Sequence, residues 1–148
     1  DVGATNRIRE IANYFNAEMV ICDKHRKRAN EISSMVVIGD VTDRDVVIID
    51  DICDTGGTLA KSAGLLKEKG ARSVRALITH PVLSGKAYEN IENSVLEELV
   101  VCDTIPMRKE SSKIKPVSVA ELFAVAIRNA YENKSITSLF IHSQRKDR

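Results

Sequence analysis

Apolar and polar positions follow two different periods along this chain. Short runs of apolar residues predict strands at residues 18–23, 35–40, 46–49, 73–80, 99–103 and 138–141. Apolar residues three and four positions apart predict helices at residues 5–16, 59–69, 84–91 and 117–131. Strands that alternate with helices predict an α/β fold, with a mostly parallel central β-sheet covered by helices on both faces. In such folds ligands bind at the carboxyl ends of the strands.

The apolar run at 46–49 leads into the most informative stretch of the chain. Its four consecutive β-branched residues predict a strand that is buried on both faces. Asp50 and Asp51 follow it, and the polar segment 54–58 then precedes the predicted helix. The first turn of a helix offers unpaired N–H groups and the positive end of the helix dipole, which suits a phosphate group. Two glycines in 54–58 let the backbone approach an anion, and two threonines add hydroxyl donors.

Acidic residues beside this segment favour a ligand that is more than a phosphate. Carboxylates accept hydrogen bonds from vicinal hydroxyl groups and can hold a magnesium ion, so Asp50, Asp51 and Asp54 favour a sugar phosphate. The segment lacks the Gly-x-x-x-x-Gly-Lys-Ser/Thr spacing of P-loop NTPases and the Gly-x-Gly-x-x-Gly spacing of dinucleotide-binding folds. Neither a Ser–His–Asp nor a Cys–His arrangement has supporting local context.

A basic segment at residues 24–30 follows the predicted strand 18–23 and is predicted to be a loop. Because both polar segments follow strands, we expect this loop at the same edge of the sheet as residues 50–58. An isolated basic run is usually a solvated turn. Beside a phosphate site, its Lys24 and Arg26 are expected instead to stabilise the charge on a phosphoryl group during transfer.

Other residues give weaker signals. Asp1 fits either the entry to a helix or a metal ligand, and His80 is expected to form hydrogen bonds at a strand end rather than to act in catalysis. Three widely spaced cysteines, Cys22, Cys53 and Cys102, are expected to be buried free thiols in a reducing cytoplasm, since their spacing supports neither a metal nor a redox site.

Length and charge exclude several classes of protein. A chain of 148 residues is one domain by length, and its net charge of +1 gives no global field that favours nucleic acid or an anionic membrane. No apolar run approaches the length needed to span a bilayer, and no secretory signal is present. The chain starts without an initiator Met and runs almost at once into a helical pattern, so we expect it to be part of a longer protein.

The stretch 48–58 resembles the phosphoribosyl-pyrophosphate loop of type I phosphoribosyltransferase folds. Together with residues 23–26, 79–85 and 138–140, it resembles the ribose-phosphate pyrophosphokinase family, whose members are also called phosphoribosyl pyrophosphate synthetases. The resemblance covers nearly all of the chain. It implies one phosphoribosyltransferase-like domain at residues 1–143, followed by a charged tail at 144–148.

The resemblance implies that the diphosphoryl group of ATP is transferred to the anomeric hydroxyl of ribose-5-phosphate, with Mg²⁺ as cofactor. It makes Lys24 the catalytic lysine and Arg26 a substrate contact, with Asp50 and Asp51 on the ribose hydroxyls and Asp1 as a magnesium ligand. The residues implied to bind the 5-phosphate are Asp54, Thr55, Gly56, Gly57 and Thr58. Two positions depart from the family pattern, Ala4 in place of a glycine and His25 in place of a common arginine.

The family has two similar halves and forms hexamers or related homo-oligomers in the cytoplasm. The chain resembles the C-terminal half. The missing N-terminal half would supply ATP contacts and a histidine ligand for magnesium. We therefore expect this chain to bind ribose-5-phosphate and to have little or no turnover alone.

Two alternatives share the loop. A base-salvage phosphoribosyltransferase needs a hood for the nucleobase, and with 4% aromatic residues the sequence shows no aromatic-rich segment for one. A non-catalytic regulatory homologue is expected to have lost Lys24 or parts of the loop, or to carry a DNA-binding extension. Lys24 and the loop are intact, and no such extension is visible.

Overall fold

The computed structural model describes residues 2–28 and 31–140, with side-chain environments for residues 8–22 and 35–140. The chain divides into two units. One unit spans residues 20–117 and contains both β-sheets, and the other combines residues up to 19 with those from 118 onward.

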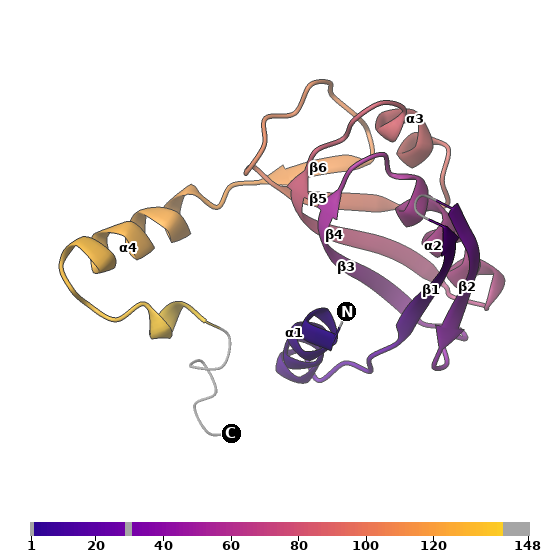
Figure 1. The fold of residues 1–148 in the computed structure, drawn as a ribbon, viewed down its shortest axis with the longest axis horizontal. Helices are drawn as coiled ribbons and strands as arrows, with labels where there is room; N and C mark the ends of the chain where they lie inside the picture. The colour runs from indigo at the N-terminus through magenta and orange to yellow at the C-terminus, as the bar shows by residue number, and fades with distance from the viewer. Residues whose placement is uncertain (1, 29–30, 141–148) are drawn as a thin grey trace. The chain divides into compact units, whose positions relative to one another are not determined.

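A four-stranded parallel sheet forms the centre of the first unit (Figure 1). Its strands lie in the order β3 (Asp45–Cys53), β4 (Ser73–Pro81), β5 (Glu98–Cys102) and β6 (Ile114–Val117). All neighbouring pairs are parallel, so the carboxyl ends of the four strands share one edge of the sheet. This sheet with its flanking helices confirms the predicted α/β class.

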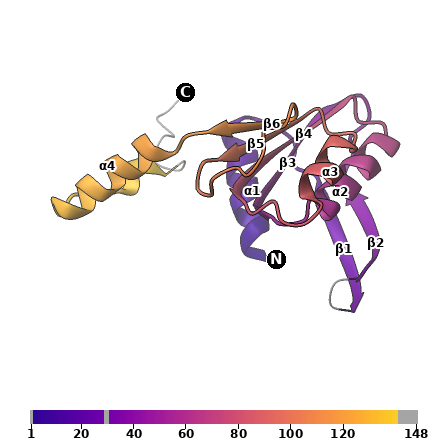
Figure 2. The ribbon, with the colours of Figure 1, turned by 90° about the horizontal axis from the view of Figure 1, so that it is seen from above.

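Helices α2 (Gly57–Glu68) and α3 (Ala87–Glu92) lie next to each other against one face of this sheet (Figure 2). The buried core joins them to that face, and it includes Leu59, Ala63, Leu66, Ala87 and Ile91 from the helices and Val74, Ala76, Ile78, Leu99 and Val101 from the strands. Burial of these side chains is the main force that holds the helices to the sheet.

Gly70 follows the C-cap Lys69 at the end of α2, close to the predicted helix end at residue 69. Gly70 has φ +94°, its N–H donates to the carbonyl of Lys67, and the N–H of Ala71 donates to the carbonyl of Leu66. These two bonds form a Schellman motif, which satisfies carbonyls that the helix leaves unpaired.

The prediction that the strand at 46–49 is buried on both faces is wrong. Within that run the side chain of Val47 is 49% exposed. The helices α2 and α3 cover one face of this sheet, whereas Val47, Leu77 and Val117 on the opposite face remain about half exposed.

A separate two-stranded antiparallel sheet precedes the parallel one. It consists of β1 (Ile21–Arg28) and β2 (Glu31–Ile38). The prediction of a loop at 24–30 is therefore wrong up to Arg28, because pairing with β2 extends the strand through polar residues. The Oγ of Ser62 in α2 donates to the sulfur of Met35 in β2 at 3.3 Å, which connects the hairpin to the core.

The second unit contains α1 (Val2–Tyr14), α4 (Ala120–Tyr131) and a short 3₁₀ turn, Thr137–Leu139. Both helices confirm the predicted helical patterns, with shifted ends. The predicted strand at 138–141 is wrong over its described residues, because local bonds from Leu139 N to Ile136 O and from Phe140 N to Thr137 O form the 3₁₀ turn instead.

The short strand β6 lies outside the predicted strands, since its four residues include Lys115 and Pro116 and form no apolar run. Among the described helices, none is long and apolar enough to cross a bilayer.

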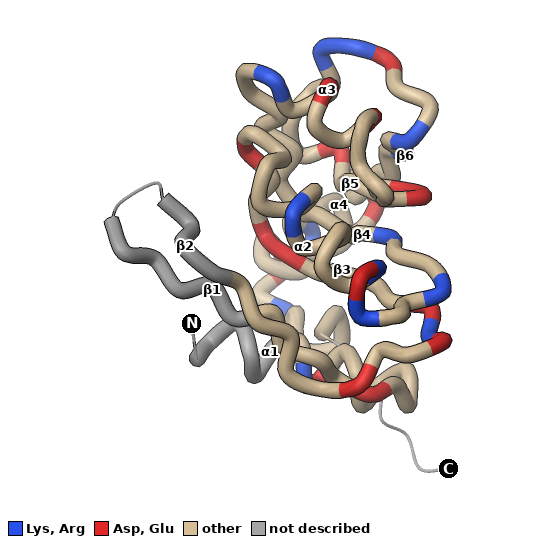
Figure 3. Tube along the Cα trace, turned by 90° about the vertical axis from the view of Figure 1, so that its right-hand side faces the viewer, with Lys and Arg blue, Asp and Glu red and all other residues tan. Residues whose placement is uncertain are grey.

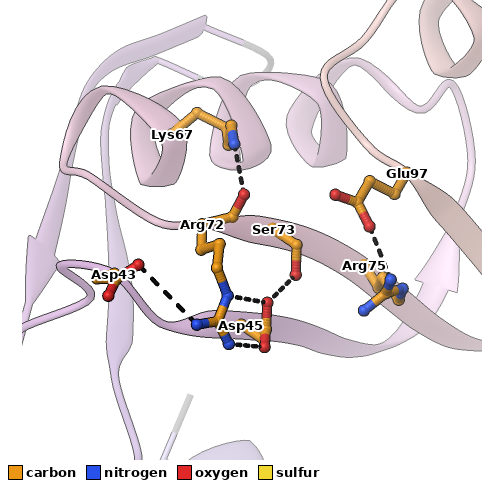
Figure 4. Close-up of polar contacts among 7 residues, drawn as sticks. All are labelled: Asp43, Asp45, Lys67, Arg72, Ser73, Arg75 and Glu97. Atoms are coloured by element: carbon orange, nitrogen blue, oxygen red, sulfur yellow. Dashed lines mark hydrogen bonds and ion pairs between the residues drawn. The ribbon is translucent and has the colours of Figure 1, made fainter.

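The amino ends of β3 and β4 are joined by a polar cluster around Asp45 (Figure 4). The Arg72 guanidinium donates to both carboxylate oxygens of Asp45, and Ser73 Oγ donates to Oδ1 at 2.6 Å. Hydrogen bonds from Arg72 and then Ser73 hold the pKa of Asp45 well below its usual range. The cluster fixes the amino end of the sheet, whereas Asp50 and Asp51 lie near the opposite, carboxyl end of β3.

Candidate functional site

The candidate site is the junction between β3 and α2. The strand ends at Cys53 and the helix begins at Gly57, with Gly56 as its N-cap in the left-handed conformation, φ +70°. Gly56 has no side chain to cap the helix, and Ala60 N donates to Gly56 O at 2.9 Å. The N–H groups before Ala60 have no acceptor within the helix, so they and the helix dipole favour an anion at this end.

The two glycines of the junction differ in their surroundings. A Cβ on Gly56 would lie 3.2 Å from the carbonyl oxygen of Ala87 and 3.3 Å from Cγ1 of Ile91, in a position that is buried. A Cβ on Gly57 would meet its nearest atoms only at 3.8 and 3.9 Å. Gly56 is therefore required by the fold, whereas Gly57 leaves space for a ligand to approach the backbone.

Asp50 and Asp51 lie near the carboxyl end of β3, where Figure 3 shows acidic positions in red along this strand. Both are exposed, and the N–H of Asp51 donates to Oδ1 of Asp50 at 3.0 Å. Successive strand residues point to opposite faces, so the two carboxylates can reach a ligand at the carboxyl end of β3 only from different sides. In the described part of the chain, no group of three or more His, Cys, Asp or Glu residues could hold a metal ion by itself.

Asp54 makes two contacts with Ser84, which follows β4. Ser84 N donates to the carbonyl oxygen of Asp54 at 3.0 Å, and Ser84 Oγ donates to its carboxylate Oδ1. The helix predicted at 84–91 begins only at Ala87, with Lys86 as its N-cap, and the Ser84 hydroxyl is bonded to Asp54 instead.

Cys53 is buried beneath the junction. Burial is the main reason why the pKa of its thiol is raised to about 11. A hydrogen bond from the Gly56 N–H lowers the pKa by a smaller amount, and the nearby carboxylates of Asp50 and Asp54 raise it further. The thiol is therefore protonated and unreactive at neutral pH. This confirms the prediction of a buried free thiol for Cys53, whereas Cys22 and Cys102, which also lack a disulfide, are only partly buried.

His80 lies at the end of β4, in register with Ile52 of β3. The Thr104 hydroxyl donates to the carbonyl of Thr79 at 2.7 Å, so its oxygen accepts from His80 Nδ1, which is 3.0 Å away. This arrangement confirms the expected hydrogen bonding of His80 at a strand end and fixes its Nδ1–H tautomer.

The structure brings the predicted residues from Asp50 to Thr58 together at one junction. Lys24 and Arg26 lie in β1, and because β1 belongs to a separate sheet, the expectation that they follow a strand of the same sheet is wrong. Their side chains lie outside the described residues, as does Asp1. Sequence reasoning missed Asn90, whose side chain reaches the junction from α3; no local pattern marks such a contact across 35 positions.

Residues 12–141 match the family model of the phosphoribosyl synthetase-associated domain. The chain belongs to this family. It is 54% identical to the ribose-phosphate pyrophosphokinase of Wolinella succinogenes over 141 residues, which cover 95% of this chain and 46% of that protein. The ribose-phosphate pyrophosphokinase of Campylobacter jejuni is 52% identical over the same shares.

A solved structure leads to the same family. The crystal structure of phosphoribosylpyrophosphate synthetase from Mycobacterium smegmatis superposes with a TM-score of 0.76 at 32% identity, over 86% of this chain and 42% of that chain. The chain thus spans less than half the length of these relatives. The matched share gives the extent of the overlap and not its position, so the prediction that the chain is the C-terminal half is withdrawn.

Proposed function

We propose that this chain is part of a ribose-phosphate pyrophosphokinase, which transfers the diphosphoryl group of ATP to the anomeric hydroxyl of ribose-5-phosphate. The observation that carries the proposal is the junction of β3 and α2, where two exposed carboxylates lie beside a helix N-terminus that favours an anion. The names of the relatives favour this activity over base salvage or a regulatory role. Such an enzyme is expected in the cytoplasm and as a homo-oligomer.

The proposed site offers hydrogen-bond donors to the phosphate group of the ligand and hydrogen-bond acceptors to its ribose. The N–H groups of Gly57 and Thr58 bind the 5-phosphate, with the hydroxyls of Thr55 and Thr58 as further donors. The carboxylates at 50 and 51 accept hydrogen bonds from the ribose hydroxyls. A free phosphate would use only the first set, so the site prefers the sugar phosphate.

Magnesium fits this arrangement as a partner of the substrate. Mg²⁺ keeps several waters and usually binds one or two carboxylates together with substrate phosphates, so it does not require a complete protein cage. Asp50 or Asp51 could supply such a ligand, and Asp1 is a further candidate. When bound, the ion neutralises charge on the phosphates during transfer.

Lys24 and Arg26 act on the transferring group from β1. A cation that contacts this group mainly in the transition state affects the chemical step more than binding. In an enzyme preparation with measurable turnover, Lys24→Ala is expected to lower kcat by orders of magnitude and to leave the affinity for ribose-5-phosphate nearly unchanged. A loss of affinity at unchanged kcat would contradict the catalytic role of Lys24.

Calorimetric titration of the 148-residue chain with ribose-5-phosphate and Mg²⁺ tests the proposal, with inorganic phosphate as the control ligand. Gly57→Ala places a methyl group where the phosphate approaches and is expected to weaken binding. Gly64→Ala is the matched control, because it lies in the same helix and its Cβ would meet no atom within 4 Å. Equal affinity for both ligands, or equal effects of both variants, would contradict the proposed function.

A further inference from the structure

We propose that Asn90 and Ser84 are positioning residues that orient the phosphate loop, defined here as residues 53–58. They do so by holding the loop's carbonyl groups on the side of α3, so that its N–H groups are available to an anion. The inference deepens the proposed function and rests on it for the identity of the ligand. The contacts themselves are independent of any ligand.

Three consecutive carbonyl groups of the phosphate loop accept hydrogen bonds from the segment after β4. The pairs are Leu83 N to Cys53 O at 3.1 Å, Ser84 N to Asp54 O at 3.0 Å, and Asn90 Nδ2 to Thr55 O at 2.8 Å. The fourth carbonyl, on Gly56, accepts from Ala60 within α2. Four successive carbonyl oxygens are thus engaged by donors of the protein.

This arrangement decides which sign of charge the loop accepts. Carbonyl oxygens repel an anion and N–H groups attract it, so a loop binds phosphate only if its carbonyls are turned away from the ligand. Donors placed along residues 83–90 hold the carbonyls in that orientation. Asn90 is the one side chain among these donors, and it contacts the residue directly before the N-cap Gly56.

The segment that carries these donors is itself fixed by the core. Leu83 is only 3% exposed and has φ +47°, a conformation that non-glycine residues rarely adopt, so its buried side chain must hold the turn in place. In α3, Ala87 and Ile91 are fully buried and pack against Gly56. The position of the loop therefore follows from the position of this segment.

Ser84 adds a contact that changes the expected role of Asp54. Its hydroxyl donates to Oδ1 of the Asp54 carboxylate, while its N–H donates to the carbonyl of the same residue. A carboxylate beside a phosphate would repel it. Engaged by Ser84, Asp54 holds the loop in position, and the donors to the phosphate come from the residues that follow it.

The test compares Asn90→Ala with Asn93→Ala, which removes the same side chain from an exposed position at the end of α3. Ser84→Ala is a second variant, which keeps the backbone bonds and removes only the hydroxyl. The first readout needs no ligand: amide hydrogen exchange at Leu83 and Ser84 is expected to be several times faster in Asn90→Ala than in the control. The second readout is the affinity for inorganic phosphate and for ribose-5-phosphate, expected to fall about tenfold in Asn90→Ala, as for loss of one hydrogen bond.

Thermal unfolding separates positioning from general stability, because Asn90→Ala and Asn93→Ala are expected to have similar Tm values. Unchanged exchange at Leu83 and Ser84 in both the Asn90 and Ser84 variants would overturn the positioning role, whatever the ligands do. Faster exchange in a chain whose unmodified form binds no ribose-5-phosphate would support the positioning role and contradict the proposed function. Faster exchange with unaltered affinity for a bound ligand would overturn the link between loop orientation and anion binding.

Discussion

Single residues at the junction of β3 and α2 have separable roles. Gly56 is required by backbone conformation and by close packing, whereas Gly57 has room around it. The sequence shows two adjacent glycines and gives no means to tell them apart, because the difference depends on Ala87 and Ile91, which lie more than 30 residues away.

Gly56→Ala is therefore expected to destabilise the fold. The left-handed conformation alone costs a residue with a Cβ about 1–2 kcal/mol, and the contact with the carbonyl of Ala87 adds to that cost. Chemical denaturation measures the change in unfolding free energy. Gly64→Ala, in the interior of α2 with open space around it, is expected to leave stability unchanged or to increase it. Equal stability of the two variants would contradict this view of the junction.

The thiol of Cys53 is expected to be the least reactive of the three. With its pKa raised to about 11, it carries little thiolate at pH 8. Mass spectrometry after treatment with iodoacetamide should find Cys53 modified more slowly than the partly buried Cys22 and Cys102. Rapid modification of Cys53 in the folded protein would show that its surroundings are more open than the structure indicates.

Elements of regular periodicity could be predicted from the sequence, and those that depend on distant pairing could not. The strands β3, β4 and β5 and the helix α2 follow local patterns and confirm the predictions. The hairpin of β1 and β2 was missed in part because its basic residues show no strand pattern, and only pairing makes them a strand. Similarly, an apolar run in the sequence does not show whether its strand lies at the edge or in the middle of a sheet, so the edge position of β3 could not be predicted.

The polar cluster at the amino end of the sheet has a predictable dependence on pH. The pKa of Asp45 is lowered in the folded state, so its ionised form stabilises the fold above the unfolded-state pKa near 3.8. This contribution is lost as the pH falls below that value toward the lower folded-state pKa. Asp45→Asn is expected to lower Tm at pH 7 and to reduce the loss of Tm between pH 4 and pH 2.

Asp43→Asn is the matched control for this change. Asp43 lies 3.9 Å from the same guanidinium and is highly exposed, so its substitution is expected to change Tm far less. If both variants gave the same Tm and the same pH profile as the unmodified chain, the cluster would not contribute to the stability of the sheet.

On the scale of the whole molecule, the family assignment and the junction support each other. The chain belongs to the phosphoribosyl synthetase-associated domain family, and it spans less than half the length of its pyrophosphokinase relatives. The first unit alone contains the sheet, the two helices that cover one face and the phosphate loop. We therefore expect binding of the sugar phosphate to be a property of this chain, and turnover to need more than these 148 residues.

Site-resolved NMR titration with ribose-5-phosphate, followed by the same titration with inorganic phosphate, tests this account most directly. Both ligands are expected to shift the amide signals of Gly57 and Thr58, and only the sugar phosphate should also shift those of Asp50 and Asp51. That result would place the phosphate on the helix N-terminus and the ribose on the carboxylates. Saturable shifts confined to other parts of the chain, or none with either ligand, would contradict the central claim.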